Sequence, residues 1–181
     1  MINIFVGLIF VFFKTNLNFL DIGVTYYVTN IIGYIFIYIG VNEMGKVNQK
    51  MLNVRPYVKI MIAHSLVFFL LNITGNSPLQ IAFSSTILEI IALVGVVFII
   101  SGMFLVFVII SLIVTNLISK TNKVLLDNLV NIMMLLFILL GISSYFNTML
   151  ATVIMVALLL LEGLFLISYY SVFLSKDEKY T

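Results

Sequence analysis

Residues 79–119 read LQIAFSSTILEIIALVGVVFIISGMFLVFVIISLIVTNLIS, a stretch whose only charged side chain is Glu89. As an α-helix this stretch would rise about 60 Å, whereas the hydrocarbon core of a bilayer is about 30 Å thick. A helix that is apolar on every side is stable in lipid rather than in water. The segment therefore predicts either one overlong membrane span or two consecutive spans.

The composition extends this prediction to the whole chain. Of 181 residues, 63% are hydrophobic and 9% are charged, whereas soluble domains are about half apolar and about a quarter charged. A folded chain of this size leaves about 30% of its surface exposed, so it could not hide this many apolar side chains from water. The sequence predicts an all-α integral membrane protein.

Six apolar segments are separated by charged or turn residues, and we expect them to form one transmembrane helical domain over residues 1–181. The first segment lacks the basic region and the small-residue cleavage site of a signal peptide, so we expect a retained, short amino-terminal helix. The expected spans are residues 2–20, 24–41, 57–74, 88–118, 124–145 and 149–174.

Basic residues decide how often residues 79–119 cross the membrane, because Lys and Arg in short loops stay on the cytoplasmic side. One crossing places every loop and tail cation listed below on one side, whereas two crossings separate them. We therefore expect about six spans with both termini cytoplasmic. The surplus length is expected to lie along the outer interface over residues 79–88, or to form a bend near Gly95 or Gly102. The cations are Lys46, Lys50, Arg55, Lys59, Lys120, Lys123, Lys176 and Lys179.

The first part of the chain contains an apolar run, an Asn-rich turn, a helix with Gly-Tyr-Ile and a basic loop. The residues concerned are Asn16, Asn18, Ile22, Gly23, Ile32, Gly33, Tyr34, Ile35, Gly40, Arg55, Pro56 and Tyr57. On these residues, the stretch from Gly7 to about Ile62 resembles uncharacterised small multi-pass membrane proteins of Firmicutes. In that family a Pro-Asp pair usually precedes the Gly-Tyr helix, whereas this chain has Thr29 and Asn30, so any role of that Asp is not carried over. The resemblance implies a membrane fold and brings no established activity.

The sequence lacks the groups that most enzymes use. It has no cysteine and one histidine, and it contains no His-Glu-x-x-His, no Gly-x-Ser-x-Gly and no phosphate-binding Gly-rich motif. We expect no catalytic residues, no metal site and no cofactor, and we do not expect an enzyme. The net charge of +2 is too small to indicate a nucleic-acid partner.

Glu162 is the strongest candidate for a functional residue. It lies in the middle of the last apolar segment, where a charge costs about 3 kcal/mol or more, so its side chain must face protein or water. One interpretation is a proton or cation site. The other is a neutral, protonated carboxyl group that donates a hydrogen bond to a neighbouring helix.

His64 and Glu89 complete the candidate intramembrane polar site. His64 lies about two turns into the third span, where it would pair with Glu162 if their helices adjoin, or bond to a backbone carbonyl across an interface. Glu89 falls at the outer end of the fourth span, where its carboxylate reaches headgroups and water. A structural role for His64 and a solvated one for Glu89 are the simpler interpretations.

Glycines seven residues apart lie on one stripe of a helix, as Gly33 and Gly40 do, and Gly95 and Gly102. Such stripes predict close contacts between helices rather than an activity.

We rank two classes of function above an intramembrane enzyme. One is small-solute or ion transport, or membrane-embedded substrate binding. The other is a non-catalytic scaffold, regulatory or immunity-type partner protein. The expected partners are the lipid bilayer and other membrane protein subunits. Abundant Phe and Tyr without Trp, together with many Ile, Asn and Lys, fit AT-rich codons, so we expect the plasma membrane of a bacterium.

Overall fold

The computed structural model describes residues 1–13, 19, 22–79, 86–117 and 123–174, and within these ranges it contains helices and loops but no strand. The helices agree with the expected segments to within a few residues, except at the end of the first. They are α1 (Ile2–Phe12), α2 (Val24–Gly45), the 3-10 helix η1 (Gln49–Val54), α3 (Arg55–Ile73), α4 (Thr86–Asn116), α5 (Lys123–Phe146) and α6 (Thr148–Phe173).

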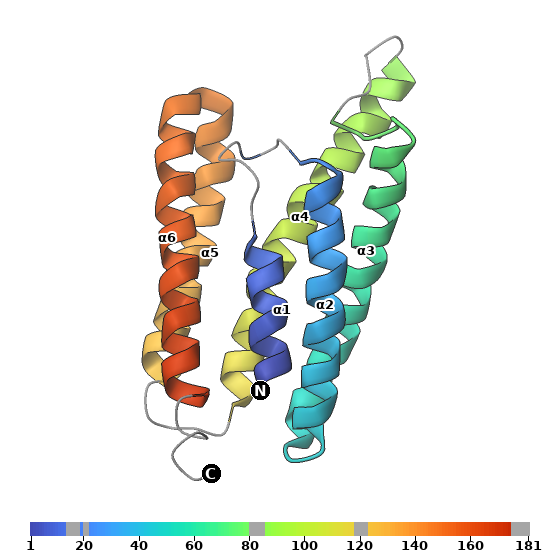
Figure 1. Ribbon diagram of the computed structural model, residues 1–181. Coiled ribbons are helices and arrows are strands. Elements are labelled where there is room, and N and C mark those ends of the chain that lie inside the picture. Colours follow the sequence, from blue (N-terminus) through green and yellow to red (C-terminus); the bar gives the residue numbers. More distant parts are fainter. Residues whose placement is uncertain (14–18, 20–21, 80–85, 118–122, 175–181) are drawn as a thin grey trace.

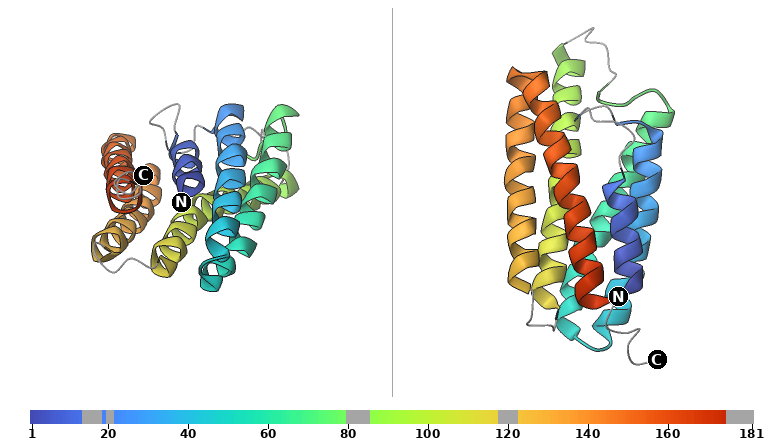
Figure 2. Two further views of the ribbon diagram at one scale, coloured as in Figure 1. Left: turned by 60° about the horizontal axis from the view of Figure 1, so that its bottom comes forward. Right: turned by 60° about the vertical axis from the view of Figure 1, so that its left-hand side comes forward.

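The α-helices of the described chain form a ring. Each packs against the next in sequence, and α1 also packs against α6. Successive helices run in opposite directions along the bundle (Figure 1). In other views α5 and α6 lie on one side, α2 and α3 on the other, and α1 and α4 between them (Figure 2). The start of α1 and the end of α6 lie at the same end of the bundle (Figure 1), which we call the terminal end; the opposite end is the far end.

Both faces of the long helices are apolar. Five of them, counting η1 and α3 as one, are long and apolar enough to cross a bilayer. Large side chains such as Leu93, Leu160 and Ile167 are exposed on the outside of the bundle, where a water-soluble helix would carry polar residues. The predicted all-α membrane bundle with a short amino-terminal helix is confirmed.

The described part of residues 79–119 crosses the bundle once, because α4 is a single helix of 31 residues. Such a helix rises about 46 Å, which exceeds the hydrocarbon thickness. The surplus is accommodated by the diagonal course of α4 and by its first turns, which extend beyond the end of α3 (Figure 1). The interfacial segment expected over residues 79–88 falls mostly on residues 80–85, outside the described part of the chain.

The first apolar segment forms a shorter helix than expected. α1 has 11 residues, which rise about 16 Å, or half of a bilayer core. It ends at Phe12, since Phe13 has an extended backbone (φ −65°, ψ 121°), so the expected helix end near residue 20 was wrong. The apolar run ends at Phe13, before Lys14, so hydropathy alone places this end within one residue; the expected span went past it into polar residues. α1 begins at the terminal end and stops about half-way along the bundle (Figure 1).

The predicted glycine stripes lie in helix contacts. A Cβ atom on Gly33 would lie 2.6 Å from Cγ2 of Val11, and one on Gly40 would lie 2.6 Å from Cγ1 of Ile4. Only glycine allows α1 and α2 to approach this closely. In α4, Gly102 faces His64 of α3, whereas Gly95 faces Pro78, which lies in the connection before α4 and not in a helix.

Basic residues gather at the terminal end. The turn after α2, which carries Lys46, is tied to the end of α4 because Asn48 Nδ2 donates to the Asn116 carbonyl oxygen at 2.6 Å. At the start of α5, Lys123 Nζ donates to the Thr115 carbonyl oxygen, also at 2.6 Å. A single crossing by α4 predicts this arrangement. Lys50, Arg55 and Lys59 lie at the same end, while Lys14, Lys120, Lys176 and Lys179 lie outside the described residues.

Candidate functional site

Glu162 lies on the inner face of α6, near the middle of the helix. It is 4% exposed, and its Oε2 atom is buried. Among the described residues it is the only acidic or basic side chain in the buried core. The buried positions follow a spacing of three and four residues, which directs them all toward the bundle interior. They are Ala151, Met155, Leu158, Glu162, Phe165, Tyr169, Val172 and Phe173.

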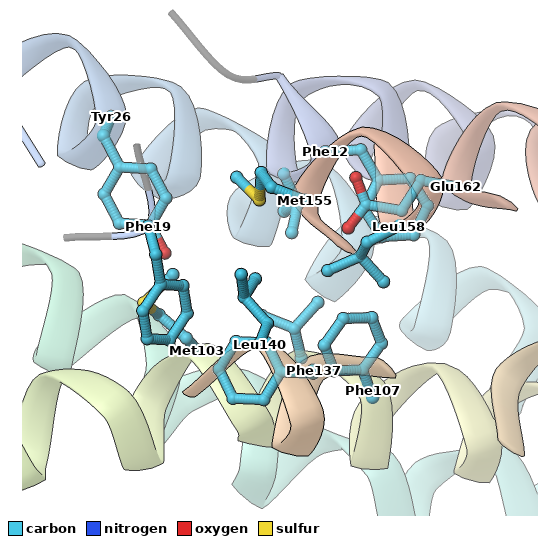
Figure 3. Close-up of a pocket in the computed structure, with 12 residues that line it drawn as sticks. Phe12, Phe19, Tyr26, Met103, Phe107, Phe137, Leu140, Met155, Leu158 and Glu162 are labelled. Atoms are coloured by element: carbon cyan, nitrogen blue, oxygen red, sulfur yellow. The ribbon is translucent and has the colours of Figure 1, made fainter. Parts of the chain in front are cut away.

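A small cavity at the centre of the bundle borders this carboxyl group. Its volume of about 20 Å³ is enough for about one water molecule. Figure 3 shows Glu162 beside Phe12 and Leu158 at one side of the cavity, and Tyr26 at the other side. Of the described residues that line it, Glu162 and Tyr26 alone have side-chain oxygen atoms. The others are Val11, Phe12, Phe19, Met103, Val106, Phe107, Phe137, Leu140, Met155 and Leu158.

The end of α1 borders the same cavity through Val11 and Phe12. The last four carbonyl groups of a helix lack partners within it, and together they carry a partial negative charge. One of them, the Phe10 carbonyl, accepts a hydrogen bond from the Phe13 N–H at 3.3 Å. The cavity thus has a helix carboxyl end on one side and Glu162 on another, an arrangement that favours a proton or a cation.

Aromatic contacts hold the half-length helix α1 against α6. The Phe12 and Phe165 rings meet edge to face with centroids 6.3 Å apart. Nearer the terminal end, Phe5 stacks on Tyr169 with centroids 6.2 Å apart and ring planes 9° apart. Such pairs contribute about 0.5–1.5 kcal/mol each beyond their buried area. They therefore fix the end of α1 beside Glu162.

Several polar groups in the core have buried atoms without a hydrogen-bond partner in the described part of the chain. Burying such a group in an apolar medium costs several kcal/mol unless water or another group pairs with it. Sequence reasoning missed these residues, although Tyr169 follows Glu162 by seven residues and therefore lies on the same helix stripe. The atoms are the hydroxyl oxygens of Tyr27, Tyr34 and Tyr169 and Oδ1 of Asn30.

The structure does not bring His64 and Glu89 to this site. His64 on α3 faces α4, where its Nε2 lies 3.0 Å from the Phe98 carbonyl oxygen and its ring covers Gly102. The helix neighbours of α3 are α2 and α4, whereas Glu162 belongs to α6. Glu89 is exposed in the first turn of α4, at the far end. Glu162 is therefore the one predicted candidate that lines the central cavity.

The described residues contain no group of three or more His, Cys, Asp or Glu side chains that could hold a metal ion. No family model, curated protein or solved structure matches the chain. The resemblance over residues 7–62 accordingly stays a prediction, and the site must be interpreted from its own geometry.

Proposed function

We propose that this chain is a transport protein of a bacterial plasma membrane, in which Glu162 binds and releases a proton or small cation while a small solute or ion is moved. The observation that carries the proposal is the end of α1 half-way along the bundle, beside the only buried carboxyl group of the described core. Helices interrupted at mid-membrane, with their ends at an ion site, are typical of secondary transporters.

The free-energy cost of placing Glu162 in the middle of the membrane supports this proposal. A leucine at that position would continue the apolar stripe of α6, whereas a charged carboxyl group in the middle of a bilayer costs about 3 kcal/mol or more. A neutral, hydrogen-bonded glutamic acid would reduce that cost. A group that alternates between the two states couples ion binding to a rearrangement of the helices around it.

In a transporter, a cavity this small corresponds to an occluded conformation. A volume of about 20 Å³ admits no solute larger than water. Transport then requires the helices around Glu162 to separate toward one side of the membrane at a time. The seam between α1 and α6 is the interface best suited to open, because α1 packs closely on α2 at Gly33 and Gly40 and meets α6 through far fewer contacts.

The basic terminal end supports a cytoplasmic location for both termini, because short loops that carry Lys and Arg stay inside. The far end, with the α3–α4 connection and the α5–α6 turn, would then face outward. That the chain is not an enzyme also stays a prediction.

Thermal unfolding in detergent tests the proposal. We expect the midpoint of the wild type to shift with pH, or with Na⁺, K⁺ or Li⁺ against choline, and we expect Glu162→Gln to abolish that shift while the protein still inserts and folds. Saturating a site at about 100 times its Kd stabilises a protein by about 2.7 kcal/mol. Glu89→Gln is the matched control, since Glu89 is exposed at the far end.

The scaffold or regulatory function is the second candidate, and one observation favours it. An open groove of about 460 Å³ lies between α4 and α5, where Ser101 and Gly141 leave room for a partner helix. If neither pH nor any of these cations shifts the midpoint of the wild type, ion coupling is contradicted and the scaffold is favoured.

A further inference from the structure

We propose that the connection between α2 and α3 binds the phosphate group of an anionic membrane lipid. The stretch from Lys46 to Lys59, which we call the basic corner, follows α2, forms η1 and begins α3. It lies at the terminal end (Figure 1), and it contains four basic residues and no acidic one. This inference does not rest on the proposed function, because it concerns a different part of the bundle from Glu162.

The positive charge of the basic corner is not neutralised within the described part of the chain, where none of its four cations forms an ion pair. The preceding acidic residue, Glu43, instead accepts hydrogen bonds from Asn3 on both carboxylate oxygens. Lys59 Nζ lies 5.7 Å from the centroid of the Tyr38 ring, a contact that orients the ammonium group and leaves its charge in place. Clustered cations of this kind attract an anion from outside the chain.

Arg55 and Lys59 form the centre of the site. They are four residues apart, so their side chains leave the same side of α3 one turn apart. Arg55 is partly exposed, and its buried Nε atom has no hydrogen-bond partner among the described residues. A guanidinium group binds phosphate oxygens through two parallel hydrogen bonds, and an ammonium group adds a point charge. The two side chains together therefore suit a phosphate group.

The surface of α3 next to these cations is suited to acyl chains. Leu66 and Ile73 follow Lys59 at intervals of seven residues and continue its side of the helix; they are 43% and 56% exposed. The span made of η1 and α3 is the least buried of the five long spans. A phospholipid would place its acyl chains on this stripe and its phosphate at Arg55 and Lys59. A soluble anion would gain only the second contact.

Native mass spectrometry of the full chain in detergent counts the bound lipids and gives their affinity. The full chain includes Asp177 and Glu178, which compete for the same cations. We expect phosphatidylglycerol to bind more tightly than phosphatidylcholine with the same acyl chains. Arg55→Gln and Lys59→Gln should each weaken binding of phosphatidylglycerol about fivefold, the effect of one cation at a membrane surface. Equal affinity of the wild type for the two lipids would overturn the proposal.

Lys123→Gln is the matched control. It removes the same charge at the same end of the bundle, but on α5, whose helix neighbours are α4 and α6. We expect it to leave the affinity for phosphatidylglycerol unchanged. Equal weakening by Lys59→Gln and Lys123→Gln would show that overall charge rather than a site attracts the lipid, and would overturn the proposal. Arg55→Lys, which keeps the charge and loses the paired hydrogen bonds, should fall between the wild type and Arg55→Gln.

Competition with soluble anions tests whether the phosphate belongs to a lipid. We expect inorganic phosphate and glycerol 3-phosphate, compared with chloride at the same ionic strength, to leave phosphatidylglycerol bound. Displacement by either would assign the basic corner to a soluble phosphate compound and overturn the lipid. The unfolding midpoint without lipid identifies the folded variants. If Arg55→Gln does not fold, Lys59→Gln decides, because Lys59 is exposed and its removal disturbs no buried contact.

Discussion

Gly7 of α1 and Gly33 of α2 meet backbone to backbone: a Cβ atom on Gly7 would lie 2.5 Å from the Gly33 carbonyl oxygen, and one on Gly33 would lie 2.7 Å from the Gly7 carbonyl oxygen. Both contacts are with backbone, which cannot rotate away as a side chain can. The position of α1, and with it the edge of the central cavity, depends on this pair.

Gly7→Ala is expected to push α1 away from α2 and to destabilise the fold by about 1–3 kcal/mol, the usual cost of overpacking. Thermal unfolding in detergent measures this effect. Gly141→Ala is the control, because a Cβ atom there would meet nothing within 4 Å. Equal midpoints for the two variants would contradict the close contact between α1 and α2.

Gly102→Ala is expected to destabilise the protein by a similar amount, since the new methyl group would collide with the His64 ring. His64→Ala removes that ring along with its bond to the Phe98 carbonyl. The cost of Gly102→Ala should therefore largely disappear when His64→Ala is also present. A double-mutant cycle of unfolding midpoints measures the coupling, and strict additivity would show that the two residues do not touch.

The orientation of the bundle can be measured with single cysteines, because the chain has none of its own. Val47 at the terminal end and Tyr145 at the far end are both strongly exposed, at 76% and 85%. Tyr145→Cys should react with a membrane-impermeant maleimide in intact cells. Val47→Cys should react only after the membrane is permeabilised. Labelling of both positions in intact cells would contradict the single crossing by α4.

Asn3 of α1 donates from Nδ2 to both carboxylate oxygens of Glu43 on α2, at 2.8 and 2.9 Å. Because the pair is exposed, we expect a coupling of only about 0.5–1 kcal/mol in a double-mutant cycle of Asn3→Ala and Glu43→Ala. A coupling of several kcal/mol would mean that this link, rather than the glycine contact, holds α1 in place.

The long helices were predictable from sequence because charged or polar residues stand at their ends. The segment expected over residues 124–145 is helical from Lys123 to Phe146, between a lysine and the asparagine that follows. Lys14 marks the end of the first apolar run in the same way, and α1 ends two residues before it. The place of α1 in the bundle was not predictable, because it depends on contacts with α2 and α6, which involve residues far apart in the sequence.

The candidate site was predictable only in part. Glu162 could be found because a carboxyl group in an apolar segment is costly wherever its helix packs. Its neighbours could not, because the order of helices in space decides that α1 rather than α3 lies beside α6. Because the sequence does not give that order, it left open a pairing of Glu162 with His64. In the structure, His64 instead contacts the Phe98 carbonyl oxygen. The seven-residue spacing to Tyr169 was visible in the sequence.

The ring of helices in chain order has a consequence for biosynthesis. As the ribosome delivers each helix to the membrane, the partner it needs has just been inserted, so α2 to α5 assemble on nearest neighbours. The seam between α1 and α6 joins the earliest of these helices to the latest. Stacking of Phe5 on Tyr169 therefore completes only after synthesis of the sixth helix, and chains arrested earlier leave the carboxyl site unassembled.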